Sequence, residues 1–232
     1  MTNYSPKFTR RRFLETISAG IVSTPLLALF KEEHLRWLES GDYADDLTRT
    51  PALEEGPYYP DKLPLDCDND LLIIGKGDQA LGEVTHLSGR VLGTDGKPMK
   101  GVTVEIWQAD QHGAYIHSKS INGSKRDSLF QGFGKFETDK NGAYKFRTIK
   151  PVPYLFRAPH VHYKIKKGDR ELLTTQCIVA DYPQLDRDIV LRTVKDPKLR
   201  ELVLVKFVPK RGSRTGELQA IFDIVLGLTP EA

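Results

Sequence analysis

The sequence predicts an all-β protein, a β-sandwich of mixed or antiparallel sheets with long loops and a short N-terminal helical extension. Two observations predict this fold class. After about residue 83, apolar and polar residues alternate with a period of two, in short runs separated by glycine-, proline- and aspartate-rich turns. Little of the chain has a helical pattern, and the clearest is a short stretch near the N-terminus, residues 31–40. Many short strands with almost no helix are typical of a sandwich.

The expected strands follow one another in regular order. The first covers residues 85–93 and is followed, after the turn TDGKPMKG, by a strand within residues 102–110. A long glycine-containing loop then leads to residues 134–149, which contain two strands around an Asp-Lys-Asn-Gly turn. A polar segment, residues 184–201, is expected to include a short helix. Further strands are expected at residues 160–166, 172–180, 202–210 and 218–227.

The N-terminus has the pattern of a targeting segment. The basic run TRRRFLE at residues 9–15 precedes a mostly apolar stretch, residues 17–30, which is too short to span a membrane comfortably. An arginine pair followed by x-Phe-Leu resembles a twin-arginine export signal. This resemblance implies recognition by the twin-arginine export machinery and a periplasmic or extracellular location. The alternative is a surface amphipathic helix with a basic start. The expected organisation is an export signal at 1–30, an arm and linker at 31–82, and the sandwich domain at 83–232.

The charge distribution gives no sign of a nucleic-acid partner. The first 30 residues hold four cations and one anion, which accounts for the net charge of +3, and the other 202 residues carry 30 of each sign. There is no long run of like charges. The only cysteines, Cys67 and Cys177, could pair in an exported protein, or Cys177 could be a small core residue. The sequence leaves this pairing and a homo-oligomeric state open.

The segment RAPHVHYKI places two histidines two residues apart. On a strand, His160 and His162 point to the same face, while Val161, Tyr163 and Ile165 point to the other face and are expected in the core. The two imidazoles would start from Cα atoms about 6–7 Å apart, close enough to converge on one metal ion. The motif alone is equally compatible with two histidines on a partly exposed strand.

Two tyrosines near this segment strengthen the metal hypothesis. Tyr154 lies in the proline-rich loop before His160, and Tyr115 lies just past the end of the expected strand at 102–110. A phenolate is a hard anionic ligand suited to Fe(III), and the set contains no carboxylate, so it differs from the facial triad of Fe(II) oxygenases. Each tyrosine taken alone is more typical of core or loop packing.

The segment from residue 56 to 179 resembles the intradiol ring-cleavage dioxygenases, the catechol and protocatechuate 3,4-dioxygenase group. The matching stretches occur in the same order over about half of the chain: GPYYP, LSGRVLGTDGKPMKGVTVEIWQADQHGAY, TDKNGAYKFRTIKP, YLFRAPHVH and TTQ. The short connection between Tyr154 and His160 is similar to that of single-chain exported members. The chain departs from the family in having Pro151-Val152-Pro153, where Pro-Gly is usual before the second tyrosine.

The resemblance implies an oxidoreductase that uses one non-haem Fe(III) per chain and O2 to open a catechol-type ring, giving a cis,cis-muconate. It implies that Tyr154 leaves the iron when substrate binds and takes up a substrate proton, that Arg157 stabilises the anionic ring, and that Gln176 supports this arginine. Tyr58 and Tyr59 would wall the substrate pocket, although packing of the arm explains them equally well. The implied iron ligands are Tyr115, Tyr154, His160 and His162.

Two other classes of function compete with this interpretation. Residues 84–110 also resemble a hairpin of transthyretin-like or carboxypeptidase-regulatory-like sandwich modules, which bind without catalysis and need no such ligand set. A zinc hydrolase using His160 and His162 would lack an evident third ligand at short spacing. The feature that separates the dioxygenase from the module is the stretch YLFRAPHVH together with Tyr115, and colour separates it from the hydrolase, because ferric phenolate is burgundy and zinc is colourless.

Overall fold

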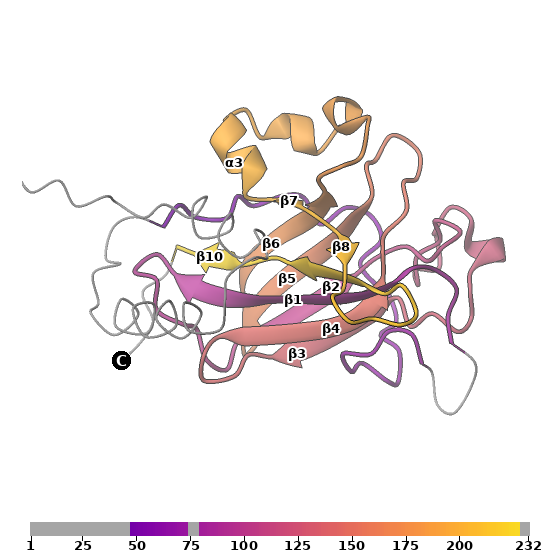
Figure 1. Ribbon diagram of the computed structural model, residues 1–232, viewed down its shortest axis with the longest axis horizontal. Helices are drawn as coiled ribbons and strands as arrows, with labels where there is room; N and C mark the ends of the chain where they lie inside the picture. The colour runs from indigo at the N-terminus through magenta and orange to yellow at the C-terminus, as the bar shows by residue number, and fades with distance from the viewer. Residues whose placement is uncertain (1–46, 74–78, 228–232) are drawn as a thin grey trace, which may run out of the picture.

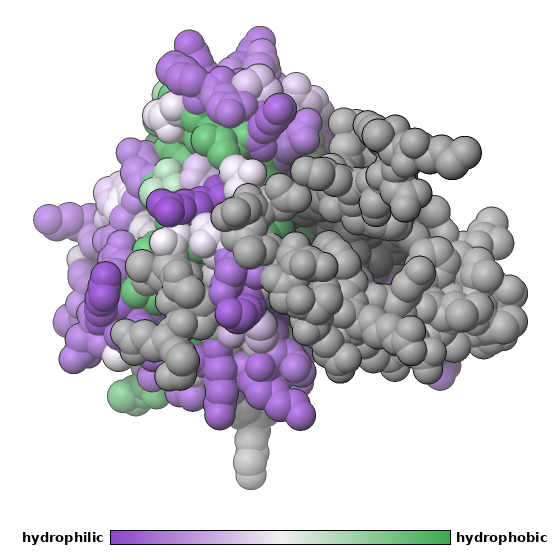
Figure 2. Space-filling model, turned by 90° about the vertical axis from the view of Figure 1, so that its left-hand side faces the viewer, coloured by the Kyte–Doolittle hydropathy of each residue, from purple (hydrophilic) through white to green (hydrophobic). Residues whose placement is uncertain are grey.

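The computed structural model describes residues 47–73 and 79–227, and within them two five-stranded sheets pack face to face (Figure 1). The predicted sandwich and its mixed sheets are confirmed. The expected export signal and the helix at 31–40 lie outside the described residues. No helix within the described ranges is long and apolar enough to cross a membrane. On the side seen in Figure 2, the described surface is mostly hydrophilic, with hydrophobic residues in small patches.

The first sheet is built around its longest strand, β1 (Val84–Gly93). Strand β4 (Ala143–Ile149) pairs antiparallel with one edge of β1. Two short strands, β9 (Leu218–Ile221) and β10 (Ile224–Leu226), share the other edge and run parallel to it. Strand β8 (Val208–Pro209) extends the sheet by pairing with β9.

The second sheet has the order β3-β2-β5-β6-β7 and carries the candidate site. Its strands are β2 (Thr103–Trp107), β3 (Phe133–Glu137), β5 (His160–Lys167), β6 (Arg170–Val179) and β7 (Leu204–Val205). All pairings are antiparallel except that of β6 with β7. One face of this sheet packs against the first sheet, and the other face is covered by loops.

The expected alternation along β5 is confirmed. Val161, Tyr163 and Ile165 are fully buried in the core between the sheets. Because successive side chains of a strand alternate in direction, His160 and His162 lie on the opposite, outer face. The strand is buried there too, since both histidines are only 2% exposed. The partly exposed strand face considered above is therefore wrong for this segment.

Two pairs of strands that are neighbours in sequence, β1 with β2 and β3 with β4, lie in opposite sheets. The hairpin interpretation of residues 84–110 is wrong, because β1 and β2 belong to different sheets. The turn predicted at residues 139–142 is present, with Gly142 N donating to Asp139 O at 2.9 Å, but it connects β3 of one sheet to β4 of the other. Turn residues predict a change of chain direction, and the burial of both faces decides which strand becomes the partner.

The last two expected strands each divide into two. Residues 218–227 form β9 and β10, with Phe222 and Asp223 between them. Here the chain passes very close to β1, and a Cβ added to Gly89 would lie 2.0 Å from the Phe222 carbonyl oxygen. Only glycine fits at this approach. Tyr144 closes the region by donating its hydroxyl to the same carbonyl at 2.5 Å.

The described part of the expected arm and linker packs into the sandwich. Leu53 N donates to Thr174 O of the second sheet at 3.0 Å, and Leu71 N donates to Arg147 O of the first sheet at 2.8 Å. Leu71 is fully buried in the central core. The arm therefore crosses both sheets and covers part of the outer face of the second one.

Short helical turns cover another part of that outer face. The polar segment after β6 forms the 3-10 turns η2 (Leu185–Arg187) and η3 (Leu191–Thr193), followed by the helix α3 (Pro197–Glu201), which lies near β7 in Figure 1. The helix expected in this segment is therefore confirmed. A further 3-10 turn, η1 (Gly123–Lys125), interrupts the long loop between β2 and β3.

Candidate metal centre

Three polar side-chain atoms, one phenol oxygen and two imidazole nitrogens, converge on the outer face of the second sheet. Tyr115 Oη lies 3.2 Å from His160 Nε2 and 3.1 Å from His162 Nε2, and the two histidine nitrogens are 3.1 Å apart. The three side chains are at most 2% exposed. Their reactive atoms therefore form a nearly equilateral triangle inside the protein.

Strand β5 supplies the two histidines, and its surroundings fix both rings. His160 Nδ1 lies 2.6 Å from the carbonyl oxygen of Ala158, which can only accept, so Nδ1 carries the proton and the Nε2 lone pair faces the triangle. The ring of His162 stacks on Trp107, its register partner on β2, with centroids 4.8 Å apart and planes 9° apart. Each imidazole is held by a different contact.

The loop after β2 delivers Tyr115 through a tight turn around Asp110. This buried carboxylate accepts the backbone N–H groups of His112 at 2.8 Å and Ala114 at 2.9 Å through one oxygen, and that of Asp127 at 2.6 Å through the other. Aspartate commonly closes turns in this way. The turn reverses the chain immediately before Tyr115, so that the phenol points back toward β5.

Tyr154 lies beside this cluster as a fourth candidate ligand. Its ring meets Tyr115 edge-on at a centroid distance of 5.4 Å and lies 5.6 Å from the ring of His160. Arg157 N donates to Tyr154 O at 2.9 Å and closes a four-residue turn, in which Leu155 has a φ of +48°. A non-glycine residue in this left-handed conformation is strained, by about 1–2 kcal/mol. The turn thus holds Tyr154 and Arg157 on one side of the cluster.

Burial decides the protonation of the cluster when no cation is present. It lowers the pKa of His160 to about 3, with Arg157 adding to the effect, and it lowers the pKa of His162 well below its usual value, with His160 adding to the effect. Burial also raises the pKa of Tyr115 and of Tyr154. The cluster is therefore two neutral imidazoles and two phenols, and a cation would favour loss of the phenol protons.

These residues fit the metal that the sequence suggested. Ligands that bind one ion at about 2.1 Å and at right angles lie about 3 Å apart, which is close to the spacing of the triangle. Neutral imidazoles and phenolates are nitrogen and hard oxygen donors of the kind that Fe(III) binds. Within the described residues, no group of three His, Cys, Asp or Glu side chains is placed to hold a metal ion, so the donor set here depends on tyrosine.

Arg157 and Gln176 form a buried polar pair next to the histidines. Arg157 Nη2 donates to Gln176 Oε1 at 2.5 Å, and Gln176 Nε2 donates to Glu54 O of the arm at 2.8 Å. Arg157 is 8% exposed and Gln176 is fully buried. Neither side chain is therefore an ordinary surface residue of the loop or strand that carries it.

The structure separates the two tyrosines expected to wall the pocket. Tyr58 stacks on Tyr115 with centroids 5.2 Å apart, so it lies against the cluster. Tyr59 instead meets Trp107 edge-on at 5.0 Å and donates its hydroxyl to Glu105 at 3.0 Å. Tyr59 therefore packs behind the tryptophan that supports His162, and its role as a pocket wall stays a prediction.

Three residues that hold the cluster were missed from the sequence. Trp107 was assigned only to a strand, Asp110 only to the end of that strand, and Asp188 only to a polar segment. The sequence gives a signal for Asp110, because an aspartate three residues before a glycine is a turn pattern. It gives none for Trp107 and Asp188, whose contacts depend on strand register and on a loop that returns to the sheet.

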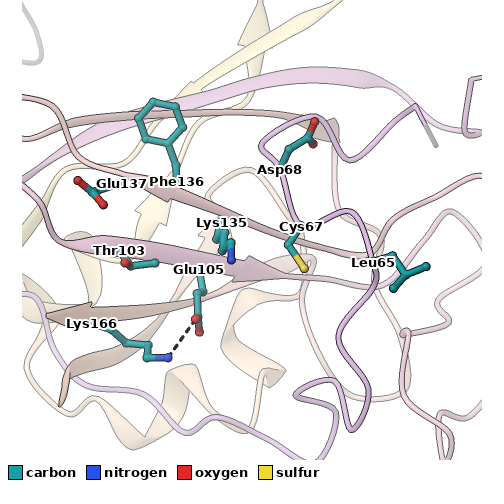
Figure 3. Close-up of a pocket in the computed structure, with 9 residues that line it drawn as sticks. All are labelled: Leu65, Cys67, Asp68, Thr103, Glu105, Lys135, Phe136, Glu137 and Lys166. Carbon is teal, nitrogen blue, oxygen red and sulfur yellow. Dashed lines mark hydrogen bonds and ion pairs between the residues drawn. The ribbon is translucent and has the colours of Figure 1, made fainter. Parts of the chain in front are cut away.

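A separate cavity of about 650 Å³ lies further along the same outer face (Figure 3). Strands β2, β3 and β5 and the arm contribute its lining. Lys166 Nζ lies 3.2 Å from Glu105 Oε1 across it. None of the candidate ligands is among the residues that line it: Leu65, Cys67, Asp68, Thr103, Glu105, Lys135, Phe136, Glu137 and Lys166.

The sequence model of a family described as Dioxygenase matches residues 54–227, three quarters of the chain. A 172-residue stretch is also 33% identical to the protocatechuate 3,4-dioxygenase beta chain of Burkholderia cepacia, covering 70% of this chain and 72% of that one. The chain belongs to the intradiol ring-cleavage dioxygenase family. The chain is therefore an enzyme, and the alternative of a non-catalytic sandwich module is wrong.

Other relatives extend the similarity of this dioxygenase. It is 29% identical over 213 residues to catechol 1,2-dioxygenase 1 of Acinetobacter lwoffii, covering 83% of this chain and 65% of that protein. The solved dioxygenase domain of a dioxygenase and carbohydrate-binding protein fusion from Streptomyces sp. SirexAA-E superposes with a TM-score of 0.60. That similarity covers 78% of this chain and 100% of that one at 28% identity.

Proposed function

We propose that this dioxygenase holds one non-haem Fe(III) and cleaves a catechol-type ring between its two hydroxylated carbons, giving a cis,cis-muconate-type product. The observation that supports this most is the buried triangle of Tyr115, His160 and His162, with edges of 3.1–3.2 Å. A ferric ion at this site would supply Lewis-acid activation of the catechol and a template for its reaction with O2.

The remaining side chains bind and orient the ring around that ion. Tyr154 lies at the edge of the cluster in a tight turn, which suits a ligand that leaves when substrate arrives. Because burial raises its pKa, a released Tyr154 phenolate readily takes up the proton that the catechol loses. Arg157 places a buried cation where negative charge develops on the bound ring. Tyr58, stacked on Tyr115, gives the ring an aromatic wall.

The charges near the cluster favour an uncharged catechol as the first substrate to test. Among the groups with the largest effects on the pKa values of the four candidate ligands, the charged side chains are Arg157 and Asp188, which form an ion pair at 3.0 Å. A carboxylate on the ring would have to share this one arginine with Asp188. We therefore expect catechol to be cleaved faster than protocatechuate.

Protein purified from iron-supplied cells tests the proposal. We expect one iron per chain, a broad tyrosinate-to-iron absorption band that shifts when catechol is added without oxygen, and O2 uptake with muconate release in air. A protein that takes up no iron after reconstitution would refute the ferric centre. A colourless protein that binds zinc and shows no ring cleavage would favour a zinc site on the two histidines instead.

We also propose that the chain is exported by the twin-arginine route and acts in the periplasm or outside the cell. The support is the basic run at residues 9–15 followed by the short apolar stretch. Fusion of residues 1–46 to a reporter that is active only after export tests this, with Arg10→Lys/Arg11→Lys as the matched variant. Equal export of both fusions would contradict the proposal.

A further inference from the structure

Asp188 is a fully buried carboxylate in the loop between η2 and η3. It accepts four N–H groups, two on each oxygen: Oδ2 from Arg157 Nε at 3.0 Å and Ala158 N at 2.7 Å, and Oδ1 from Val190 N at 2.9 Å and Leu191 N at 2.7 Å. The side chain is 0% exposed. All four partners are donors, so the position requires a group that only accepts.

An asparagine amide could not replace this carboxylate. Its NH2 group cannot accept a hydrogen bond, so one of the two pairs of N–H groups would face another donor. Burying such unpaired donors costs about 1–3 kcal/mol each. The loop thus brings a carboxylate to a point where the segment before β5 and the turn of η3 both present donors.

The contact restricts the orientation of Arg157. Its guanidinium is planar, and two of its three nitrogens are engaged, since Nε donates to Asp188 and Nη2 donates to Gln176. Two contacts in one plane fix both the position and the rotation of the group. These two hydrogen bonds leave both N–H groups of Nη1 and one of Nη2 to interact with a ring bound at the cluster.

We propose that Asp188 is a positioning residue that acts through Arg157, an inference that rests on the proposed ring cleavage. By holding Nε, Asp188 keeps the guanidinium oriented toward the anionic ring and prevents it from turning away to bind water or another carboxylate. The ion pair does not itself contact the ligands, because Tyr115, His162 and His160 are positioned by the turn around Asp110, by Trp107 and by the carbonyl oxygen of Ala158.

A second route from Asp188 to the cluster has to be separated from this one. Asp188 also accepts the N–H of Ala158, whose carbonyl oxygen accepts from His160 Nδ1 at 2.6 Å. A change at Asp188 could therefore move the histidine ligand through this peptide group. Movement of a ligand changes the coordination of the iron and therefore its absorption, whereas reorientation of Arg157 leaves the ligands in place.

Four variants distinguish these routes: Asp188→Asn, Arg157→Met, the double variant, and Thr193→Val as the control. Thr193 donates to Val190 O at 2.7 Å, so Thr193→Val weakens η3 without touching Arg157. For each iron-loaded protein, we would measure the charge-transfer band, the Kd of catechol without oxygen, and kcat and KM in air. Thermal unfolding of each protein shows how much of any change is loss of stability.

We expect Asp188→Asn to reduce kcat/KM for catechol by about 10–100-fold, as loss of a supporting residue typically does. We expect its charge-transfer band to be unchanged and its catechol Kd to be raised. In the Arg157→Met background, adding Asp188→Asn should change kcat/KM by less than about twofold, because the two residues act as one unit. Thr193→Val should lower the unfolding temperature while leaving Kd and kcat/KM near wild type.

Three results would overturn the proposal. The first is that Asp188→Asn lowers kcat/KM by the same factor in wild-type protein and in Arg157→Met. The second is a shifted charge-transfer band in Asp188→Asn, and the third is wild-type kcat and KM in that variant. If the double variant does not fold, the two single variants still test the proposal. Asp188→Asn and Arg157→Met must then have similar Kd values for catechol, and both must keep the wild-type charge-transfer band. Failure of the wild-type protein to bind iron or cleave catechol would instead refute the proposed function, before any variant is compared.

Discussion

Replacing Tyr115 with phenylalanine removes a single oxygen from the centre of the proposed metal site. The ring should stay in place, because its stacking on Tyr58 and its edge contacts with Tyr154 and His162 do not involve the hydroxyl. The variant therefore separates the role of the oxygen from the role of the ring in packing.

The structure sets the size of the effect in iron-free protein. Tyr115 Oη lies within 3.2 Å of the Nε2 atoms of both His160 and His162, so its loss removes a buried hydrogen-bond partner and leaves these two nitrogens only each other. Loss of such a partner costs about 1–3 kcal/mol. For a domain of this size, each kcal/mol lowers Tm by about 2–4 °C. Loss of a residue that supports a ligand typically lowers metal affinity by about 10–100-fold. Loss of the ligand oxygen itself should therefore lower iron affinity by more than this.

The matched control is Tyr144→Phe, which removes a buried tyrosine hydroxyl from the core between the sheets, whereas the cluster lies on the outer face of the second sheet. That hydroxyl donates to Phe222 O at 2.5 Å in the core between the sheets. Chemical unfolding should show a comparable loss of stability in both variants, while iron content and the charge-transfer band should change only in Tyr115→Phe. Full iron loading and an unaltered band in Tyr115→Phe would refute the assignment of Tyr115 as a ligand.

Three further predictions concern packing, pH and thiols. Trp107→Ala should cost about 3–5 kcal/mol in chemical unfolding and lower iron content, because His162 loses the ring stacked on it, while Trp107→Phe should cost less. Iron-free protein should lose stability as pH falls from about 6.5 toward about 3, because His160 binds a proton in the unfolded chain but stays neutral when it is buried in the folded protein. Urea titrations at several pH values measure this loss. Since burial raises the pKa of both thiols, Cys67 should react slowly with a thiol reagent in native protein, and fully buried Cys177 only after unfolding.

Each of these predictions has an outcome that contradicts it. Normal iron content in Trp107→Ala would mean that the stacked ring does not hold His162. Between about pH 6.5 and 4, His160 should take up a proton only in the unfolded chain. If the free energy of unfolding of the iron-free protein stays constant over this range, the imidazoles are not buried in their neutral form. If each thiol reacts with the reagent as fast in native protein as in unfolded protein, the positions of Cys67 and Cys177 are contradicted.

Much of the site was accessible from the sequence because local spacing has a fixed geometric meaning. Two histidines separated by one residue on a strand must share a face, and the apolar residues between and after them must occupy the other. The tyrosines were found through residue chemistry and the family resemblance, since Tyr115 is 45 residues before His160 and no local rule connects them. Their meeting within 3.2 Å depends on the turn around Asp110, and the sequence shows only that a turn is present.

By itself, the sequence determined the strands, the orientation of side chains along β5 and the chemical types that could bind iron, because these depend on periodicity and on residue chemistry. The tertiary structure decided which strands pair. It placed β1 and β2 in opposite sheets, although a short turn joins them. It also decided what supports the site: Trp107 reaches His162 through strand register, and Asp188 reaches Arg157 from a loop 31 residues away. Such contacts join segments distant in sequence, and their partners are fixed only when the core is packed.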